Sequence, residues 1–232
     1  ETKDAASGEY HPDKERLERE LKNAEDILNN ELSSPVEIHN TITTRDVGRG
    51  FGGLNAWQPL GITAAAGEEG TIFVGHNTLQ TGANTNLQLV ATQYHAESSP
   101  MSQTVATLKV GRNDITIPQI GTTASERGGA LYVQYTGNNA NDHYAVRVNG
   151  GTEVPRLDLY QITDPAERLV RTEKYVEELK TYTAKVQTMH EELHSSSENS
   201  LVDYPYQEQD CILEASDILM DSMMLSVPAK QI

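Results

Sequence analysis

The sequence of 232 residues is poor in the residues on which several classes of protein depend. Its single cysteine, Cys211, excludes an internal disulfide and a cysteine-based zinc site. Only 18 Lys and Arg stand against 34 Asp and Glu, and this net charge of −16 argues against nucleic acid as a partner, because phosphates are bound by clustered cations. No apolar run approaches the roughly 18 residues of a membrane-spanning helix, so membrane insertion is not expected. The N-terminus has no basic region followed by an apolar one, which leaves secretion open.

The residues that are present predict three regions. Hydrophobic residues make up 37% of the chain, enough for the core of one large domain or two small ones. In residues 1–35 we expect one amphipathic helix, over about residues 12–32, because apolar side chains recur there at three- and four-residue spacing. The predicted buried stripe of this helix consists of Leu17, Leu21, Ala24, Leu28 and Leu32.

Residues 36–162 follow a different pattern, with short β-prone runs bounded by Gly, Asn, Asp and Pro. The runs predict eight strands, at residues 36–44, 71–74, 87–94, 104–110, 114–118, 130–135, 144–148 and 154–160. Such a series is typical of a β-sandwich, here one of jelly-roll-like form. With the flanking helices, the chain is expected to be a mainly β protein of the α+β class.

Residues 163–232 are predicted to be a helical segment that begins a further, catalytic domain. Capping signals near Pro165 open a helix that runs to about residue 193. A second helix is expected over about residues 210–225, which are apolar around most of the circumference and must be buried. Because that helix would lack a packing partner, we expect the chain to be a fragment. The first helix carries on one face Leu169, Val176, Leu179, Val186 and Leu193.

Glycines punctuate a stretch that begins at Trp57 and runs into the predicted strand at 71–74. A Leu-x-x-Gly-x-Asn segment follows at residues 108–113, and a Gly-Gly-hydrophobic-Tyr strand at residues 128–133. Glycines supply positive φ or close backbone approach in turns between strands, so we interpret most of these positions as scaffold. The first stretch has the order Pro-x-Gly, small residues and Gly-Glu, through Pro59, Gly61, Gly67 and Glu68.

These three motifs, in this order over roughly residues 55–160, resemble the enhancin-like (M60) zinc metallopeptidases. The resemblance implies a secreted or cell-surface protein whose relatives cut mucin-like glycoproteins. In that family the zinc-binding helix lies C-terminal to the β-sandwich. The resemblance therefore implies that the catalytic part lies beyond Ile232, with zinc expected in the full-length protein and none in this fragment.

One motif offers a zinc site within the chain itself. His190, Glu191 and His194 form an H-E-x-x-H pattern on the predicted helix, where two imidazoles one turn apart face one metal and the glutamate serves as general base. Glu214 lies downstream at a distance suited to a third ligand. Zinc proteases usually have no charged residue at the place of Glu192, and a hydrophobic residue rather than serine two positions after the second histidine. We therefore favour a structural interpretation, with two histidines near a helix C-terminus where cations are stabilised by the helix dipole.

Two further features offer binding sites of other kinds. Asp142 and His143 lie in an Asn-rich loop whose oxygens suit calcium, although the spacing is not that of an EF-hand. The sequence has no P-loop, dinucleotide-binding fingerprint or G-x-S-x-G motif, so no cofactor-binding residues are expected. Four aromatic residues would stack on sugars if exposed, although at least half of them are expected in the core. They are Trp57, Tyr94, Tyr132 and Tyr135.

The sequence thus predicts the N-terminal, non-catalytic portion of a secreted or surface zinc metallopeptidase resembling the enhancin-like family. Its partners would be a glycoprotein or glycan substrate and the missing C-terminal catalytic domain. Two alternatives stay open. One is a stand-alone carbohydrate- or protein-binding surface module, and the other is a small zinc protease that uses residues 190–194.

Overall fold

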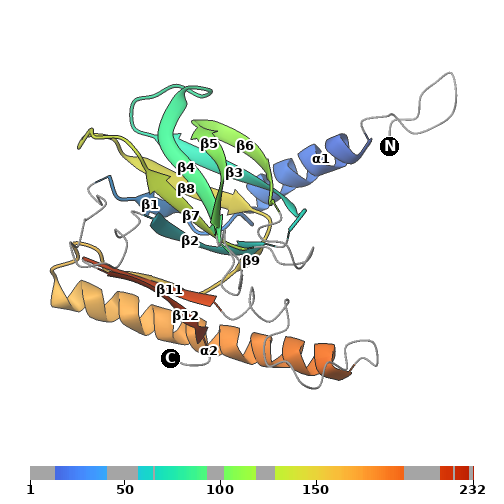
Figure 1. Cartoon of the computed structure of the whole chain (residues 1–232), viewed down its shortest axis with the longest axis vertical. Helices are drawn as coiled ribbons and strands as arrows, with labels where there is room; N and C mark the ends of the chain where they lie inside the picture. The colour runs from blue at the N-terminus through green and yellow to red at the C-terminus, as the bar shows by residue number, and fades with distance from the viewer. Residues whose placement is uncertain are drawn as a thin grey trace, which may run out of the picture.

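The computed structural model describes residues 14–40, 57–64, 66–92, 102–118, 129–195, 215–221, 223–229 and 232. In these ranges the chain forms two helices and three β-sheets, which confirms a mainly β protein of the α+β class. The sheets and helices are stacked in layers (Figure 1). None of the helices in the described ranges combines the length and the apolar character needed to cross a membrane.

Two antiparallel sheets form the middle of the stack, and each of the eight predicted runs contains a strand. The four-stranded sheet has the order β1-β8-β3-β6, with β1 at Val36–Ile38, β8 at Tyr144–Asn149, β3 at Glu69–His76 and β6 at Gly111–Thr116. The five-stranded sheet has the order β5-β4-β7-β2-β9, with β5 at Ser102–Lys109, β4 at Asn84–Thr92, β7 at Gly129–Tyr135, β2 at Trp57–Ala64 and β9 at Thr152–Glu153.

The facing sides of these two sheets share one hydrophobic core. Alternate residues of each strand point into it, as the two-residue period of a strand requires. Ile72 and Val146 come from the four-stranded sheet, and Leu89 and Val133 from the five-stranded sheet, and all four are fully buried. The strands are therefore held by pairing within each sheet and by apolar packing between the two sheets.

Strand β2 covers residues that the sequence analysis treats as a turn region. Its pairing with β7 is interrupted between Pro59 and Thr63, and Gly61 sits in this bulge with φ of +70°. A proline cannot donate to the ladder and is tolerated at a bulge. A Cβ at Gly61 would lie 3.2 Å from the Cβ of Arg156, so a side chain there would push against Arg156 in addition to the strain of the positive φ. The motif glycine thus marks an irregular strand.

The C-terminal region is a third sheet, and the helix predicted over residues 210–225 is wrong. Strands β11 (Ala215–Met220) and β12 (Met223–Pro228) form a hairpin, and β11 pairs in parallel with β10 (Arg156–Asp158). The run is apolar on both faces because layers cover both faces of this sheet. A fully buried strand and a fully buried helix then carry the same signal.

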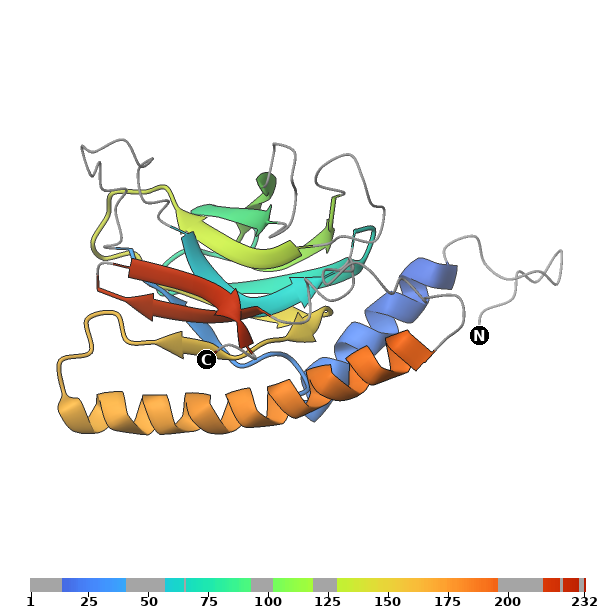
Figure 2. The same ribbon diagram turned by 60° about the horizontal axis from the view of Figure 1, so that its bottom comes forward.

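Helix α2 (Pro165–Ser195) packs beneath this third sheet, as Figure 2 shows. The helix confirms the prediction, and its buried face agrees with the predicted face in part. Leu179 of the predicted face is buried against the sheet with Tyr175 and Tyr182, whereas Leu169 and Val176 of that face are exposed. Aromatic side chains bury more area than Val, and they decide which face of the helix turns inward.

Helix α1 (Lys14–Asn29) lies on the outer face of the four-stranded sheet, with its predicted orientation reversed. The polar residues Asn23 and Asp26 are buried, while Leu21 and Leu28 are 60% and 84% exposed. The sheet surface beneath the helix is polar, since Asn23 donates to the Oγ1 of Thr71 at 3.0 Å. Hydrogen-bonding groups on that surface select the polar side of the helix.

Candidate functional site

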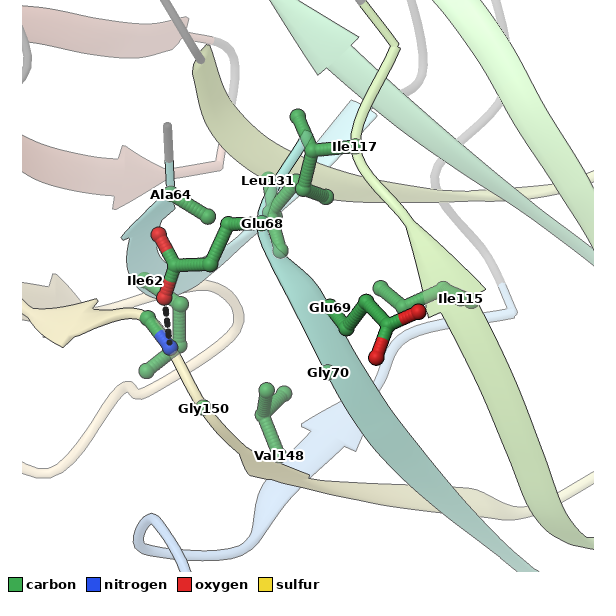
Figure 3. A pocket seen from close by; sticks show the side chains of 11 residues that line it. Ile62, Ala64, Glu68, Glu69, Gly70, Ile115, Ile117, Leu131, Val148 and Gly150 are labelled. Atoms are coloured by element: carbon green, nitrogen blue, oxygen red, sulfur yellow. Dashed lines mark hydrogen bonds between the residues drawn. The ribbon is translucent and has the colours of Figure 1, made fainter. Parts of the chain in front are cut away.

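A cleft of about 440 Å³ opens between α1 and the end of the four-stranded sheet, beside the Gly-Glu motif. The motif supplies Glu68 and Glu69 at the start of β3, and a smaller apolar recess continues from the cleft into the sheet edges (Figure 3). The carboxylate of Glu68 turns toward the β8–β9 turn and accepts a hydrogen bond from the Gly151 amide at 2.9 Å. The residues that line the cleft with polar side chains include Arg19, Lys22, Glu31, Glu68, Glu69 and Glu153.

The turn that closes one side of this cleft depends on glycine. Gly150 and Gly151 have φ of +106° and +73°. A Cβ at Gly151 would lie 2.7 Å from both the Cγ2 of Ile62 and the carbonyl oxygen of Thr63. Only a residue without a side chain permits this approach, so the wall of the cleft is fixed by backbone.

Ion pairs tie α1 to the cleft. The guanidinium of Arg19 pairs with the carboxylate of Glu69, and the Lys22 ammonium donates to Asp26 at 2.6 Å. The bond from Lys22, together with that from Asn149, holds the pKa of Asp26 below its ordinary value. The cleft therefore offers carboxylate acceptors and cationic donors side by side. That combination suits a polar ligand rich in hydroxyl groups.

A second polar cluster lies between the third sheet and the outer face of the five-stranded sheet. Asp217 on β11 is 1% exposed, and its Oδ1 accepts hydrogen bonds from the hydroxyls of Tyr132 at 3.1 Å and Ser226 at 2.7 Å. Burial raises the pKa of Asp217 to about 6, although these bonds and the charge of Arg156 oppose the shift. The cluster joins β7, β11 and β12, and it is closed to ligands by the layers around it.

Next to it, Arg156 and His39 share the carboxylate of Asp158. Arg156 donates to Asp158 Oδ2 at 2.8 Å and to the Pro59 carbonyl at 2.7 Å, and His39 Nε2 lies 2.8 Å from the same carboxylate oxygen. Burial would raise the pKa of Asp158, yet the bond to His39 and the Arg156 charge hold that pKa below its usual range. These groups link β1, β2 and β10, which is a structural role.

The remaining motif residues also have structural roles, as the sequence analysis interprets them. The amide of Asn113 donates to the carbonyl oxygens of Lys109 and Gly111 and accepts from the Lys109 amide, which closes the β5–β6 turn. The Gly-Gly-hydrophobic-Tyr motif is strand β7, whose Tyr132 is buried. Three motifs distant in sequence thus serve one scaffold.

In the Asn-rich loop, the oxygen atoms considered as calcium ligands accept hydrogen bonds from other residues of the protein. The Nδ2 of Asn40 donates to the carbonyl oxygens of Asn139, Ala140 and Asp142 at 2.5 to 3.1 Å. The Asp142 carboxylate accepts from the Tyr135 hydroxyl at 2.8 Å, and its pKa stays below the ordinary value despite burial. These loop oxygens accept hydrogen bonds within the protein, and the calcium hypothesis stays a prediction.

Of the four aromatic residues considered for sugar stacking, the two tyrosines that the structure describes lie in the core. Tyr132 and Tyr135 are buried, and the half-buried ring of Trp57 lies against Tyr132 with 5.9 Å between centroids. Tyr94 lies outside the described residues. Aromatic residues in this part of the chain contribute to packing, as expected for at least half of them.

The H-E-x-x-H segment is helical in backbone, as predicted, since residues 190–194 fall within α2. The side chains of His190, Glu191 and His194 lie outside those that the structure describes, as do Glu214 and Cys211. Among the described side chains, no group of three His, Cys, Asp or Glu is placed to hold a metal ion. The zinc ligands therefore stay a prediction, and no chemical step is derived through zinc.

No protein family and no curated protein matches this sequence, but solved structures do. Three come from Clostridium perfringens. The M60 catalytic domain of ZmpC, in complex with the sialyl T antigen, is 20% identical with a TM-score of 0.54, over 85% of this chain and 34% of that one. A ZmpB structure with CBM32 and M60 catalytic domains is 18% identical with a TM-score of 0.55, over 95% of this chain and 21% of that one. Another ZmpB structure, with M60 and CBM51 domains, is 17% identical with a TM-score of 0.53, over 86% of this chain and 19% of that one.

The fold is therefore M60-like. This confirms the fold expected from the motifs at Pro59, Gly111 and Gly129. The chain spans about a third or less of the length of the proteins it matches.

The sequence analysis did not predict the polar clusters around Asp217 and Asp158. Asp217 lies in a run predicted to be a helix, where an isolated carboxylate is expected to face solvent. In the folded chain Ser216, Ile218 and Met220 face α2, and Asp217 and Leu219 lie on the other side, so each face has polar and apolar residues and the sequence shows no clear alternation. The cleft could not be found because α1 turns its polar face to the sheet.

Proposed function

We propose that this chain is the non-catalytic, sheet-forming portion of an M60-like zinc metallopeptidase that acts outside the cell on mucin-like glycoproteins. We interpret its four- and five-stranded sheets as a jelly-roll-like β-sandwich. The observation that carries the proposal is the match of 85% of the chain to part of an M60 catalytic domain with a TM-score of 0.54. The three motifs in family order support it independently.

In this proposal the chain braces the zinc-bearing part. The first half of α2 leaves three apolar side chains in solvent, Leu169, Val170 and Val176, of which the first two are 58% and 63% exposed. A contiguous apolar surface on a helix is typical of a contact with another structural unit. The zinc-bearing part would pack on this face of α2. Tyr175 fixes α2 to the third sheet, and Asp217 fixes the third sheet to the five-stranded sheet.

The cleft beside Glu68 would hold the glycan of the substrate. Its carboxylate and cationic side chains can form hydrogen bonds with sugar hydroxyls. Because Tyr132 and Tyr135 are buried, we propose the cleft in their place as the surface that contacts the glycan. The ZmpC structure in complex with the sialyl T antigen supports a glycan as the ligand class.

Zinc content and proteolysis test the assignment of catalysis. The purified chain should hold far less than one zinc per molecule by mass spectrometry and should not cleave mucin or casein. His190→Ala should leave both readouts unchanged, as should His143→Ala, an exposed control. Stoichiometric zinc that is lost in His190→Ala, together with cleavage that is lost in both His190→Ala and Glu191→Gln, would instead make the chain a small protease. A longer reading frame that encodes a downstream H-E-x-x-H would favour the proposal.

Calorimetric titration with the sialyl T antigen trisaccharide tests the cleft. Binding should weaken by roughly tenfold in Glu153→Ala, which removes an acceptor from the cleft. The matched control is Glu37→Ala, an exposed glutamate on β1 outside the cleft. Equal loss in both variants, or binding unchanged in both, would exclude the cleft. Tight binding by this chain without any protease activity in the longer protein would favour a stand-alone binding module.

A further inference from the structure

Helix α1 presents a continuous apolar stripe to solvent. Leu17, Leu21, Ala24 and Leu28 are separated by four, three and four residues, and all are exposed. This is the spacing of a and d positions in a coiled coil, which places them in one row along the helix. The opposite side of α1 is the one that Arg19, Asn23 and Asp26 attach to the sheet.

The stripe is available while α1 stays in place. The amide of Asn149 on β8 donates to both Asn23 at 2.6 Å and Asp26 at 2.8 Å, so one strand residue holds two helix residues that lie one turn apart. At the C-terminal end, the Ser33 amide donates to the Val148 carbonyl and the Val148 amide donates to the Ser33 hydroxyl. The helix is therefore a fixed platform, and a partner would add a second helix to it.

Charge defines the partner. Three carboxylates lie at the e and g positions beside the apolar row, those of Glu18, Glu20 and Glu25, and Glu20 lies 3.7 Å from the Arg16 guanidinium. Glu20 and Glu25 flank the apolar row on either side, at the positions where coiled coils place partner-selecting charges. The Lys22 ammonium is already bonded to Asp26. A partner helix with Lys or Arg beside its apolar row would complement this edge.

The same charges disfavour a second copy of this chain. In a parallel pair Glu20 would face Glu25 of the other copy, and in an antiparallel pair Glu18 would face Glu25. Like charges at these positions oppose association. The chain as a whole carries a net charge of −16, which also repels anionic membranes.

We propose that the outward face of α1 binds a basic amphipathic helix of a separate protein. This inference does not rest on the proposed function, because its observations come from the exposed face of α1 and not from α2 or from the similarity to solved structures.

Fluorescence anisotropy with a designed probe tests the proposal. The probe is a labelled 21-residue helical peptide with Leu at a and d and Lys at e and g, and its counter-probe has Glu at e and g. The wild-type chain should bind the Lys probe at physiological salt, and Leu21→Ser/Leu28→Ser should weaken binding by roughly tenfold or more. Leu169→Ser/Val170→Ser, which removes exposed apolar residues from α2, should bind as the wild type does.

Four outcomes would overturn the proposal. Equal binding of the Lys probe by both double variants would show attraction by net charge alone. Equal binding of the two probes by the wild type would show apolar contact without charge selection. Self-association of the wild type that is lost in Leu21→Ser/Leu28→Ser, seen by sedimentation, would assign the face to a second copy. A melting temperature lowered by more than about 3 °C in that variant would show that the stripe is packed inside the fold.

Discussion

At the scale of single residues, Asp217 connects three strands through one oxygen atom. Its Oδ1 accepts from Tyr132 and Ser226, and these two hydroxyl oxygens lie 3.1 Å apart. Removing a carboxylate from water disfavours its charged form, which is why the pKa of Asp217 rises to about 6. The folded protein therefore binds a proton there more tightly than the unfolded chain does.

Asp217→Asn should change how stability depends on pH. In the wild type, the contribution of Asp217 to stability is complete below its unfolded pKa near 3.8 and is lost as the pH rises through about 6. A shift of this size corresponds to about 3 kcal/mol at most. The amide keeps an acceptor oxygen and cannot ionise. The free energy of unfolding of the variant, minus that of the wild type, should thus increase between pH 4 and pH 7.5 in urea titrations. A difference that stays constant over this range would contradict the raised pKa.

Two glycines with positive φ allow a matched comparison. Gly151→Ala should cost at least about 2 kcal/mol, because the new Cβ adds a close contact with Ile62 and Thr63 to the strain of φ +73°. Gly67 has φ of +81°, and a Cβ there would have no atom within 4 Å, so Gly67→Ala should cost about 1 kcal/mol from backbone strain alone. Chemical denaturation measures both values. Equal costs would show that contact at Gly151 contributes nothing.

At the scale of elements, α2 is held to the third sheet by one face. Tyr175, Leu179 and Tyr182 recur at the spacing of that face, and the Tyr175 hydroxyl bonds the Ser216 hydroxyl on β11. The helix therefore carries both an apolar contact and a buried hydrogen bond. Its position depends on the hairpin, and the hairpin depends on it.

Leu179→Ala and Leu169→Ala should separate the two faces of α2. Leu179 is 8% exposed, and its truncation should lower the free energy of unfolding by about 2–4 kcal/mol through lost packing. Leu169 is 58% exposed, so the same substitution should change stability by less than about 0.5 kcal/mol. Urea denaturation followed by circular dichroism gives both numbers. A larger loss at Leu169 than at Leu179 would contradict the burial of Leu179 and the exposure of Leu169.

The elements that the sequence predicts correctly are those with clear local signals. The strands around Ile72, Leu89 and Val146 are short β-prone runs bounded by turn residues, and α2 begins at Pro165 as its capping signals indicate. Residues 215–228 fail because a strand covered on both faces shows no alternation. The orientation of α1 fails because the polar sheet surface that selects its buried face lies elsewhere in the sequence.

The same distinction applies to the candidate site. The sequence analysis interprets the motif at Glu68 as scaffold, and only the structure shows that a cleft opens there. Its walls come from α1 and from the turn at Gly151, and neither contact follows from spacing along the sequence. The buried carboxylates of Asp142 and Asp217 acquire their partners only in the folded protein.

At the scale of the whole molecule, net charge acts against the layered structure. A charge of −16 on 232 residues produces repulsion that the compact state must tolerate. Salt screens such repulsion over about 10 Å at 0.1 M ionic strength. The molecule should therefore be less stable in dilute buffer than at physiological salt.

The melting temperature should rise by about 2–5 °C when NaCl is increased from 10 to 200 mM at pH 7.5, as measured by differential scanning fluorimetry. At pH 5, close to the isoelectric point of about 4.8, the same increase in salt should have a much smaller effect. A salt response of the same size at both pH values would point to ion binding or to hydrophobic effects in place of charge repulsion.

The parallel pairing of β10 with β11 has a consequence for synthesis. Leu157 reaches its partner Ile218 only after the intervening helix has been made. A ribosome that adds roughly 5–20 residues per second takes on the order of three to twelve seconds over that interval. Until then Tyr132 and Val90, on the outer face of the five-stranded sheet, have no covering layer. The nascent chain therefore passes through a stage at which a chaperone would bind it most strongly.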